Sequence, residues 1–185
     1  MKLNIVLVEP EIPQNTGNIV RTCAATGAKL HLVEPLGFQI TDKYLKRAGL
    51  DYWDKLEIER HISFSEFLKK YDPEQTNMFF ITSKGTHRYD EPKYEDMDEV
   101  FLLFGKETKG LPEDIMKKYI NKTMRIPMID GIRCLNLSNA VSILAYEVIR
   151  HTNFAILKKL VKGYWKIKPR LKYILGLKVI IREVF

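Results

Sequence analysis

Five short apolar segments recur along the first part of the chain. They lie at 3–8, 30–33, 79–82, 100–104 and 124–128. Nearly continuous apolar runs of this length are typical of strands that are buried on both faces of a parallel sheet. Helix-like patterns separate the runs, at 15–26, 41–48, 63–71, 112–119 and 137–150. Strands that alternate with helices predict an α/β fold, with a mostly parallel sheet and helices on both of its faces.

The first expected helix carries a candidate anion-binding residue. Pro13 and either Asn15 or Thr16 favour its start, and Gly27 favours its end. Arg21 lies off the apolar stripe of this helix, one turn beyond Asn18. Side chains lean toward the N-terminus of a helix, so the guanidinium can reach back to an opening whose free backbone N–H groups favour an anion. The alternative is a solvated surface arginine.

A loop between two glycines follows the apolar run at 100–104. Gly105 and Gly110 bound this loop, and Pro112 suits the first turn of the next helix. A glycine at the carboxyl end of a buried strand lets the backbone approach a ligand closely, although a plain tight turn is the alternative. Leu111 and Pro112 stand where a P-loop needs lysine and a hydroxyl residue, which disfavours nucleoside triphosphate hydrolysis. No GxGxxG follows the first strand, so a dinucleotide site is unsupported.

The last apolar run leads through Pro127 into a polar loop and a further helix. Asn136 and Ser138 both suit the cap of that helix. Its second face is half polar and carries Ser142, Tyr146 and Ile149. Such a face packs against a partner subunit or faces water.

Composition limits the class of protein. The chain has 185 residues, 45% of them hydrophobic, which suits one domain with a full core. Cys23 and Cys134 lie far apart, and no cysteine or histidine pair has zinc-ligand spacing, so we expect no disulfide framework and no metal. The four histidines, at 31, 61, 87 and 151, have no matching partners in the sequence, so we expect them to be ordinary surface or core residues. The N-terminal apolar run is too short for a signal peptide, and no apolar run of about 18 residues follows. These features predict a cytoplasmic protein that is not a membrane protein.

The positive charge is concentrated at the C-terminus. The whole chain carries +7, and residues 153–185 alone carry +8 from nine Lys or Arg and one Glu, so residues 1–152 carry −1. We therefore expect a body at 1–152 and a basic amphipathic extension at 153–185. Three interpretations of the extension remain open: an RNA-binding arm that contacts phosphates, a helix on a membrane surface, or an aberrant terminus.

Three ordered motifs resemble those of the SPOUT (α/β-knot) RNA methyltransferases. The motifs are NTGNIVR at 15–21, FGKETKG at 104–110 and IPMIDGIRCLNLS at 126–138. The likeness extends to flanking segments at 9–14, 34–38 and 49–53, and it covers about residues 1–152. Within this superfamily the chain is most similar to the minimal bacterial branch that methylates the ribose of the tRNA wobble nucleotide, a cytidine or a modified uridine.

The resemblance implies a site and a cofactor. It implies a C-terminal trefoil knot that holds S-adenosylmethionine and requires no metal. By position, the residues that contact the cofactor are Ile81, Gly105, Ile126, Cys134 and Leu135. Many relatives have serine at the position of Cys134, which a backbone contact would tolerate. The family is homodimeric through the first and last helices of the body, which gives the second face of the Tyr146 helix a partner.

The resemblance also assigns Arg21 as the residue that activates the ribose hydroxyl. A guanidinium stays protonated in proteins, so we expect it to clamp a phosphate and to stabilise alkoxide charge rather than to act as a general base. Supporting candidates for catalysis or RNA binding are Asn15, Asn18, Glu107, Arg133, Asn136, Ser138 and Tyr146. Several of these are equally explained as helix caps or as packing. Two other functions remain open: a knotted methyltransferase with a different RNA target, and a catalytically silent RNA-binding member.

Overall fold

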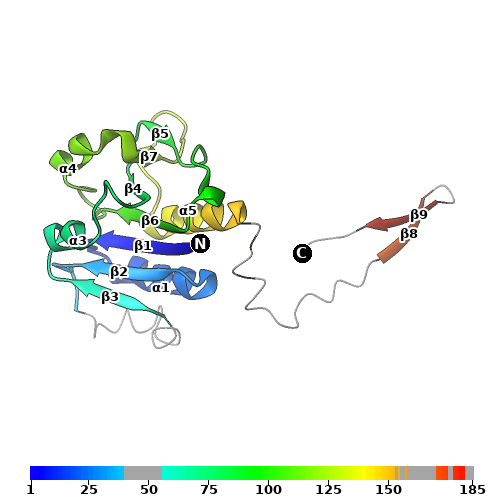
Figure 1. Cartoon of the computed structure of the whole chain (residues 1–185), viewed down its shortest axis with the longest axis horizontal. Coiled ribbons are helices and arrows are strands. Elements are labelled where there is room, and N and C mark those ends of the chain that lie inside the picture. The colour runs from blue at the N-terminus through cyan, green and yellow to red at the C-terminus, as the bar shows by residue number, and fades with distance from the viewer. Residues whose placement is uncertain (40–55, 153, 155–156, 158–169, 175–176, 182–185) are drawn as a thin grey trace.

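A seven-stranded sheet forms the centre of the molecule (Figure 1). The computed structural model describes residues 1–39, 56–152, 154, 157, 170–174 and 177–181. The strands are β1 Lys2–Val8, β2 Lys29–Val33, β3 Ile58–His61, β4 Met78–Ile81, β5 His87–Arg88, β6 Glu99–Phe104 and β7 Thr123–Arg125. Their order is β3-β2-β1-β6-β4-β7-β5, and each neighbouring pair is parallel. The predicted parallel sheet is confirmed.

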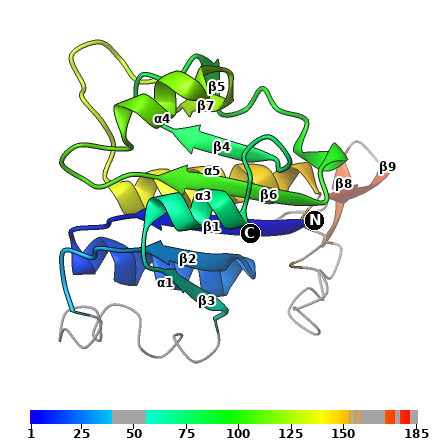
Figure 2. The ribbon, with the colours of Figure 1, turned by 60° about the vertical axis from the view of Figure 1, so that its left-hand side comes forward.

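Helices cover both faces of the sheet, as the sequence predicts (Figure 2). The helices are α1 Pro13–Thr26, α3 Phe64–Lys70, α4 Glu113–Lys118 and α5 Leu137–His151, with short 3-10 turns η1 Tyr94–Asp96 and η2 Ile120–Lys122. Buried side chains of α1 and α5 belong to one hydrophobic cluster, whereas α3 and the segment around α4 pack on a second cluster. The expected helix at 41–48 and the similar segment at 49–53 lie outside the described residues.

Strand β1, in the interior of the sheet, contributes side chains to both hydrophobic clusters. Successive side chains of a strand point to opposite faces. Ile5 and Leu7 accordingly pack with α1 and α5, whereas Val6 and Val8 pack with α3. All four side chains are at most 2% exposed, so the strand reads in sequence as a continuous apolar run rather than as an alternating one.

The ends of the long helices follow the predicted residues with small shifts. Pro13 is the first residue of α1, and Gly27 ends it in the left-handed conformation with φ 71°. Asn15 lies inside the first turn of α1 rather than at its cap. Asn136 caps α5 by accepting a hydrogen bond from the Ser138 backbone N–H.

The prediction was wrong at three strands of the sheet. β3 was missed because Glu59, Arg60 and His61 give it no apolar run, which an edge strand that pairs only with β2 can tolerate. The two-residue strand β5 was missed because both its residues are polar and exposed. β7 ends at Arg125 rather than at residue 128. Pro127 follows soon after, and it has no N–H for a strand pair.

The C-terminal extension contains an antiparallel hairpin. Its strands are β8 Arg170–Ile174 and β9 Leu177–Ile181. The amphipathic pattern expected between residues 154 and 166 falls almost entirely outside the described residues. None of the described helices is long and apolar enough to cross a membrane.

Candidate active site at the carboxyl edge of the sheet

Three neighbouring strands end together at one edge of the sheet. Ile81 closes β4 and is paired in register with Phe104 of β6 and Met124 of β7. Gly105 and Ile126 follow those two strands within two residues of the paired positions, so they emerge at the same edge. Open α/β sheets bind ligands at the carboxyl ends of their strands. The structure therefore brings together three of the five positions that the resemblance implies for the cofactor.

Gly105 is required by the fold of its own loop. The backbone turns back so that Lys106 pairs with Gly110, and Gly110 adopts a φ of +70°. A Cβ atom on Gly105 would lie 2.0 Å from the carbonyl carbon of Gly110. The loop after β6 is therefore a tight turn, as one of the two interpretations of its glycines predicted. The turn brings the chain from β6 against the start of α1.

Glu107 joins this loop to the N-terminus of α1. Its carboxylate accepts hydrogen bonds from the backbone N–H groups of Glu11 (2.8 Å) and Ile12 (3.3 Å). The side chain of Asn15 donates a third hydrogen bond to it, over 2.9 Å. Ile12 stands at the cap position and makes no side-chain cap of its own. Glu107 therefore acts as the missing cap, and a carboxylate suits the positive end of the helix dipole.

The contact between the two segments is reciprocal. The Glu11 carboxylate accepts hydrogen bonds from the backbone N–H of Thr108 (3.0 Å) and from its hydroxyl (2.8 Å). The hydrogen bonds from Thr108 lower the pKa of Glu11. Lys106 forms an ion pair with Glu9 over 2.5 Å. Sequence reasoning did not single out Glu9, Glu11, Lys106 or Thr108, because nothing local in the sequence pairs residues almost a hundred positions apart.

Asn15 extends the network to the third motif. Its side-chain oxygen accepts a hydrogen bond from Asn136 over 3.0 Å. Asn136 in turn accepts from the backbone N–H and the hydroxyl of Ser138, over 2.9 and 2.7 Å. A continuous chain of hydrogen bonds thus runs from Glu107 through Asn15 and Asn136 to Ser138. The structure brings together four of the predicted supporting residues, and Asn136 is both a cap and a bridge.

The helices that carry the first and third motifs pack side by side. The hydroxyls of Thr22 on α1 and Ser142 on α5 lie 3.0 Å apart. Ser142 also donates to the carbonyl of Ser138. Ile149, which the sequence pattern places on the second face of this helix with Tyr146, is instead buried at 1% exposure. The exposed part of α5 is therefore narrower than expected.

The remaining predicted residues are exposed, and their side chains form no hydrogen bond with this network among the described residues. They are Asn18, Arg21, Arg133, Cys134, Leu135 and Tyr146. The Arg21 guanidinium makes no hydrogen bond or ion pair with another residue in the described part of the chain. Its expected reach back over the start of α1 is therefore not seen as a polar contact.

Apolar side chains on the loop after β7 and on α5 are also exposed. Their exposed fractions are 79% for Ile129, 53% for Ile132, 36% for Leu135, 38% for Ile143 and 45% for Tyr146. Single exposed apolar residues are ordinary, but several on adjoining segments favour a surface that something else covers.

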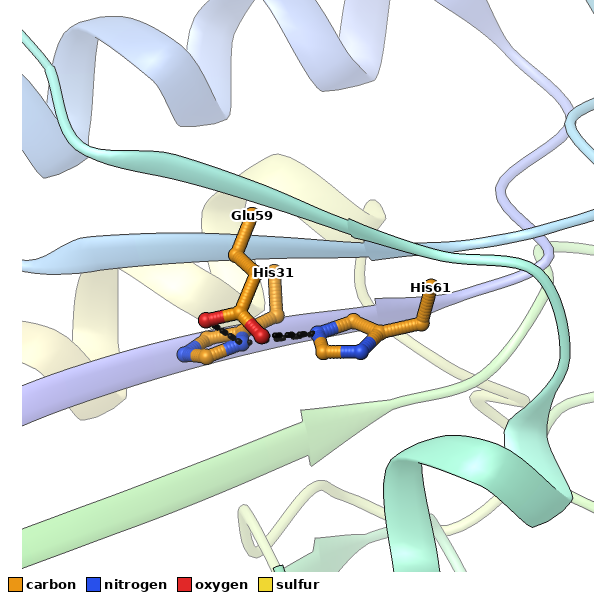
Figure 3. Close-up of side chains that lie close together, drawn as sticks. All are labelled: His31, Glu59 and His61. Carbon is orange, nitrogen blue, oxygen red and sulfur yellow. Dashed lines mark hydrogen bonds and ion pairs between the residues drawn. The ribbon is translucent and has the colours of Figure 1, made fainter. Parts of the chain in front are cut away.

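Two features lie on the opposite, α3 side of the sheet. A groove of about 520 Å³ runs between α3 and α4, and Phe64, Leu68, Ile115 and Tyr119 contribute to its lining. His31, Glu59 and His61 form a close cluster on β2 and β3 (Figure 3). The expectation that the histidines lack partners was wrong for His31 and His61, whose ring nitrogens lie 3.0 Å apart. Missing β3 in the sequence hid this pairing.

Known proteins resemble the chain over most of its length. A family model described as the SpoU rRNA Methylase family matches residues 2–146. The tRNA (cytidine(34)-2'-O)-methyltransferase of Escherichia coli (strain K12) is 47% identical over 153 residues, which are 82% of this chain and 95% of that protein. A solved structure described as "Structural insights into the 2-OH methylation of C/U34 on tRNA" is 42% identical, covers 83% of this chain and 97% of that chain, and superposes with a TM-score of 0.76.

A second similar solved structure is described as bound to AdoMet. The AdoMet-bound rRNA methyltransferase from Sinorhizobium meliloti is 26% identical and has a TM-score of 0.72. It covers 81% of this chain and 56% of that chain. The family match spans well over half of the sequence, and the fold, the parallel sheet and the joined motifs agree with it. The chain belongs to the SpoU methylase family of RNA methyltransferases.

Proposed function

We propose that the chain methylates the ribose 2′-hydroxyl of nucleotide 34 of tRNA, with S-adenosylmethionine as the methyl donor. The Escherichia coli relative carries this activity in its name, and a solved relative concerns methylation of C/U34. The observation that carries the proposal is the hydrogen-bond chain from Glu107 through Asn15 to Asn136. It joins all three motifs into one rigid edge, on which a cofactor and a ribose can be positioned together. With tRNA as substrate, we expect the enzyme to act in the cytoplasm.

We place the donor at the carboxyl ends of β4, β6 and β7, against Ile81, Gly105 and Ile126. Cys134 and Leu135 complete the site from the loop that follows. Within this loop, the one backbone hydrogen bond among the described residues runs from Ile132 N–H to the Ile129 carbonyl. The other backbone groups of the loop have no described backbone partner within it and can bind the polar parts of the cofactor, while Leu135 and Ile126 offer apolar surface. The cofactor supplies an electrophilic methyl group. We further propose that the segments after β6 and β7 form the trefoil knot of the family.

Arg21 is the proposed catalytic residue. The 2′-hydroxyl must lose its proton as its oxygen attacks, and alkoxide charge develops on that oxygen. Its guanidinium carries a positive charge in a planar fork, so it binds the phosphate beside the ribose through two N–H groups and stabilises this charge. A phosphate oxygen held in this way accepts the proton. Glu107 and Asn15 act as positioning residues, since they fix the helix that carries Arg21 against the donor loop.

We propose a homodimer through α1 and α5. The exposed Ile143 and Tyr146 supply apolar surface on α5, and α1 lies beside it. A partner subunit seated there would cover this surface and bring its own Arg21 near the site across the interface.

We propose that residues 1–152 form the methyltransferase unit and that 153–185 add phosphate contacts. The family match, which ends at residue 146, supports the first part of this division. The +8 charge of 153–185 supports the second, because neutralised phosphates release counterions and strengthen binding. The body is nearly neutral, so the extension supplies most of the long-range attraction for RNA.

Methyl transfer to a defined nucleotide tests the proposed function. Undermodified tRNA is incubated with the enzyme and isotope-labelled S-adenosylmethionine, and the methylated nucleoside is mapped by mass spectrometry. We expect one 2′-O-methyl group at position 34. A methyl group on a base or on rRNA would reject this RNA target. Cofactor binding without transfer to any RNA would instead support a catalytically silent member.

A further inference from the structure

A second set of chemically versatile side chains lies on the other face of the sheet. His31 is on β2, whereas Glu59 and His61 occupy alternate positions on β3, and His31 is paired in register with Glu59. Alternate residues of a strand share a face, and a residue opposite them on the next strand shares it too. Figure 3 shows the three side chains converging on the same side of the two strands. One ligand atom from each lies within 4.8 Å of the others.

The hydrogen bonds around His31 fix which ring nitrogen faces this cluster. Asn4 uses its side-chain NH₂ to donate to Glu99 (3.1 Å) and to the Val100 carbonyl (3.3 Å). Its oxygen therefore accepts from His31 Nε2–H, over 3.1 Å. The lone pair of neutral His31 is then on Nδ1, which faces His61. Histidines that bind metals almost always donate their other N–H to an oxygen in this way.

Burial keeps both imidazoles in the form that binds metals. Desolvation lowers the pKa of His31 to about 4 and also lowers that of His61. The two rings are nearly coplanar, and His61 Nε2–H donates to His31 Nδ1 over 3.0 Å. A shift of the His61 proton from Nε2 to Nδ1 would free a second lone pair without adding or removing a proton.

Glu59 is ionised and partly exposed. Partial burial raises its pKa, but hydrogen bonds from Lys70, Lys29 and Tyr71 outweigh this and lower the pKa to about 2. The bonds are 2.7 Å from Lys70, 2.9 Å from Lys29 and 3.0 Å from Tyr71. Lys70 is 59% exposed, so its ammonium can leave the carboxylate for solvent, whereas Lys29 is only 25% exposed and also pairs with Glu57.

We propose that His31 Nδ1, His61 Nε2 and one carboxylate oxygen of Glu59 bind a divalent transition-metal cation of the zinc type. Zinc–nitrogen bonds of about 2.0–2.1 Å at a tetrahedral angle put the two nitrogens about 3.4 Å apart, close to the present 3.0 Å. Oε2 of Glu59 lies 3.9 Å from His31 Nδ1, and its other carboxylate oxygen, Oε1, lies 3.6 Å from His61 Nε2. Small movements of the three side chains would therefore complete the site. The His61 ring would turn, and the Lys70 ammonium would leave the Glu59 carboxylate.

Two imidazoles and one carboxylate select the type of cation. Imidazole nitrogen suits zinc, copper and nickel, whereas magnesium and calcium prefer a full set of oxygen ligands. The cation would fasten the edge strand β3 to β2 and so stabilise the folded chain in proportion to its occupancy. The donor edge lies elsewhere, at the carboxyl ends of β4, β6 and β7, so we expect methyl transfer to be insensitive to this metal.

Calorimetric titration of the full-length, chelator-treated protein with Zn²⁺ tests the site. We expect one equivalent to bind, and the His61→Gln variant to bind at least about 100-fold more weakly, because Gln keeps an N–H for His31 but is a poor ligand. The Lys70→Gln variant should bind about 5-fold more tightly, since it removes a competing charge at an exposed position. His87→Gln, which alters an exposed histidine near Glu91, is the matched control and should bind as the wild type does.

Three results would overturn the proposal. They are no stoichiometric binding by the wild type, equal binding by the wild type and His61→Gln, and loss of binding in His87→Gln. If His61→Gln fails to fold, two measurements test the site instead: the Zn²⁺ affinity of Lys70→Gln, and the visible spectrum of Co²⁺ bound to the wild type. Tetrahedral nitrogen and oxygen ligation gives strong d–d bands, and their absence, with no gain in the affinity of Lys70→Gln, rejects the site.

Discussion

Truncation of Glu107 to alanine is the sharpest perturbation of the candidate site. The side chain caps α1 from a loop 95 or 96 positions away in sequence, and it is the acceptor for two backbone N–H groups and for Asn15. Its removal leaves the first turn of α1 without a cap. It also leaves the side-chain NH₂ of Asn15 without its acceptor, and Asn15 is the residue whose oxygen accepts the hydrogen bond from Asn136. The variant therefore tests whether the three motifs form one mechanical unit.

The expected cost follows from these contacts. A hydrogen bond to a charged group contributes about 1.5–3 kcal/mol, and loss of a helix cap costs about 0.5–2 kcal/mol. The Glu11 and Asn15 bonds are short, but the Ile12 bond is long and water can replace it. We therefore expect a loss of about 2–3 kcal/mol in the free energy of unfolding. For a chain of this size this corresponds to a fall in melting temperature of about 5–10 °C. The affinity for S-adenosylmethionine should fall about tenfold as the donor loop loosens.

Thermal melting and calorimetric titration with S-adenosylmethionine measure the two effects. Glu113→Ala is the matched control, because Glu113 is an acidic residue at the start of another helix, α4, but forms only an exposed ion pair with Lys117 over 2.9 Å among the described residues. Its melting temperature should stay within about 2 °C of the wild type. Equal melting temperatures for Glu107→Ala and Glu113→Ala, with unchanged cofactor affinity, would refute the role given to Glu107.

Four further predictions address the cofactor, the chemistry, the assembly and the extension. Arg21→Lys should lower kcat at least about 100-fold and leave cofactor affinity unchanged, because an ammonium cannot form the two-point contact with a phosphate; near-normal kcat in a steady-state assay would contradict this. Tyr146→Asp should convert a dimer into monomers in analytical ultracentrifugation, and an unchanged dimer would exclude α5 from the interface. Cys134→Ser should bind S-adenosylmethionine within about threefold of the wild type in calorimetry, whereas a loss above about tenfold would assign the contact to the thiol. Deletion of 153–185 should raise KM for tRNA and flatten its salt dependence while kcat is unchanged, and an unaltered salt slope would remove the extension from the RNA interface.

The central sheet and the helix ends could be predicted because their signals are local. The runs at 3–8 and 100–104 are nearly continuous and apolar, since both faces of these strands are covered. Pro13 and Gly27 mark the ends of α1 through the backbone conformations that they favour. Such features depend on neighbouring residues alone, and the sequence displays them directly.

The contacts that form the site could not be read from local pattern. Glu107 caps a helix that starts at Pro13, and no spacing rule links positions so far apart. The resemblance identified Glu107 and Asn15 as candidates, but it did not reveal that they bind each other. The histidine cluster was missed for a related reason: β3 is a polar edge strand, so its register with β2 was invisible. The knot is implied by the resemblance alone, because chain threading leaves no local signal.

A crystal structure with bound S-adenosylhomocysteine would locate the donor site. We predict that its sulfur lies at the carboxyl edge of the sheet, between the loops that follow β4, β6 and β7, with backbone groups near Gly105 and Cys134 in contact. Density for the ligand in the groove between α3 and α4, or anywhere remote from Gly105, would contradict the account.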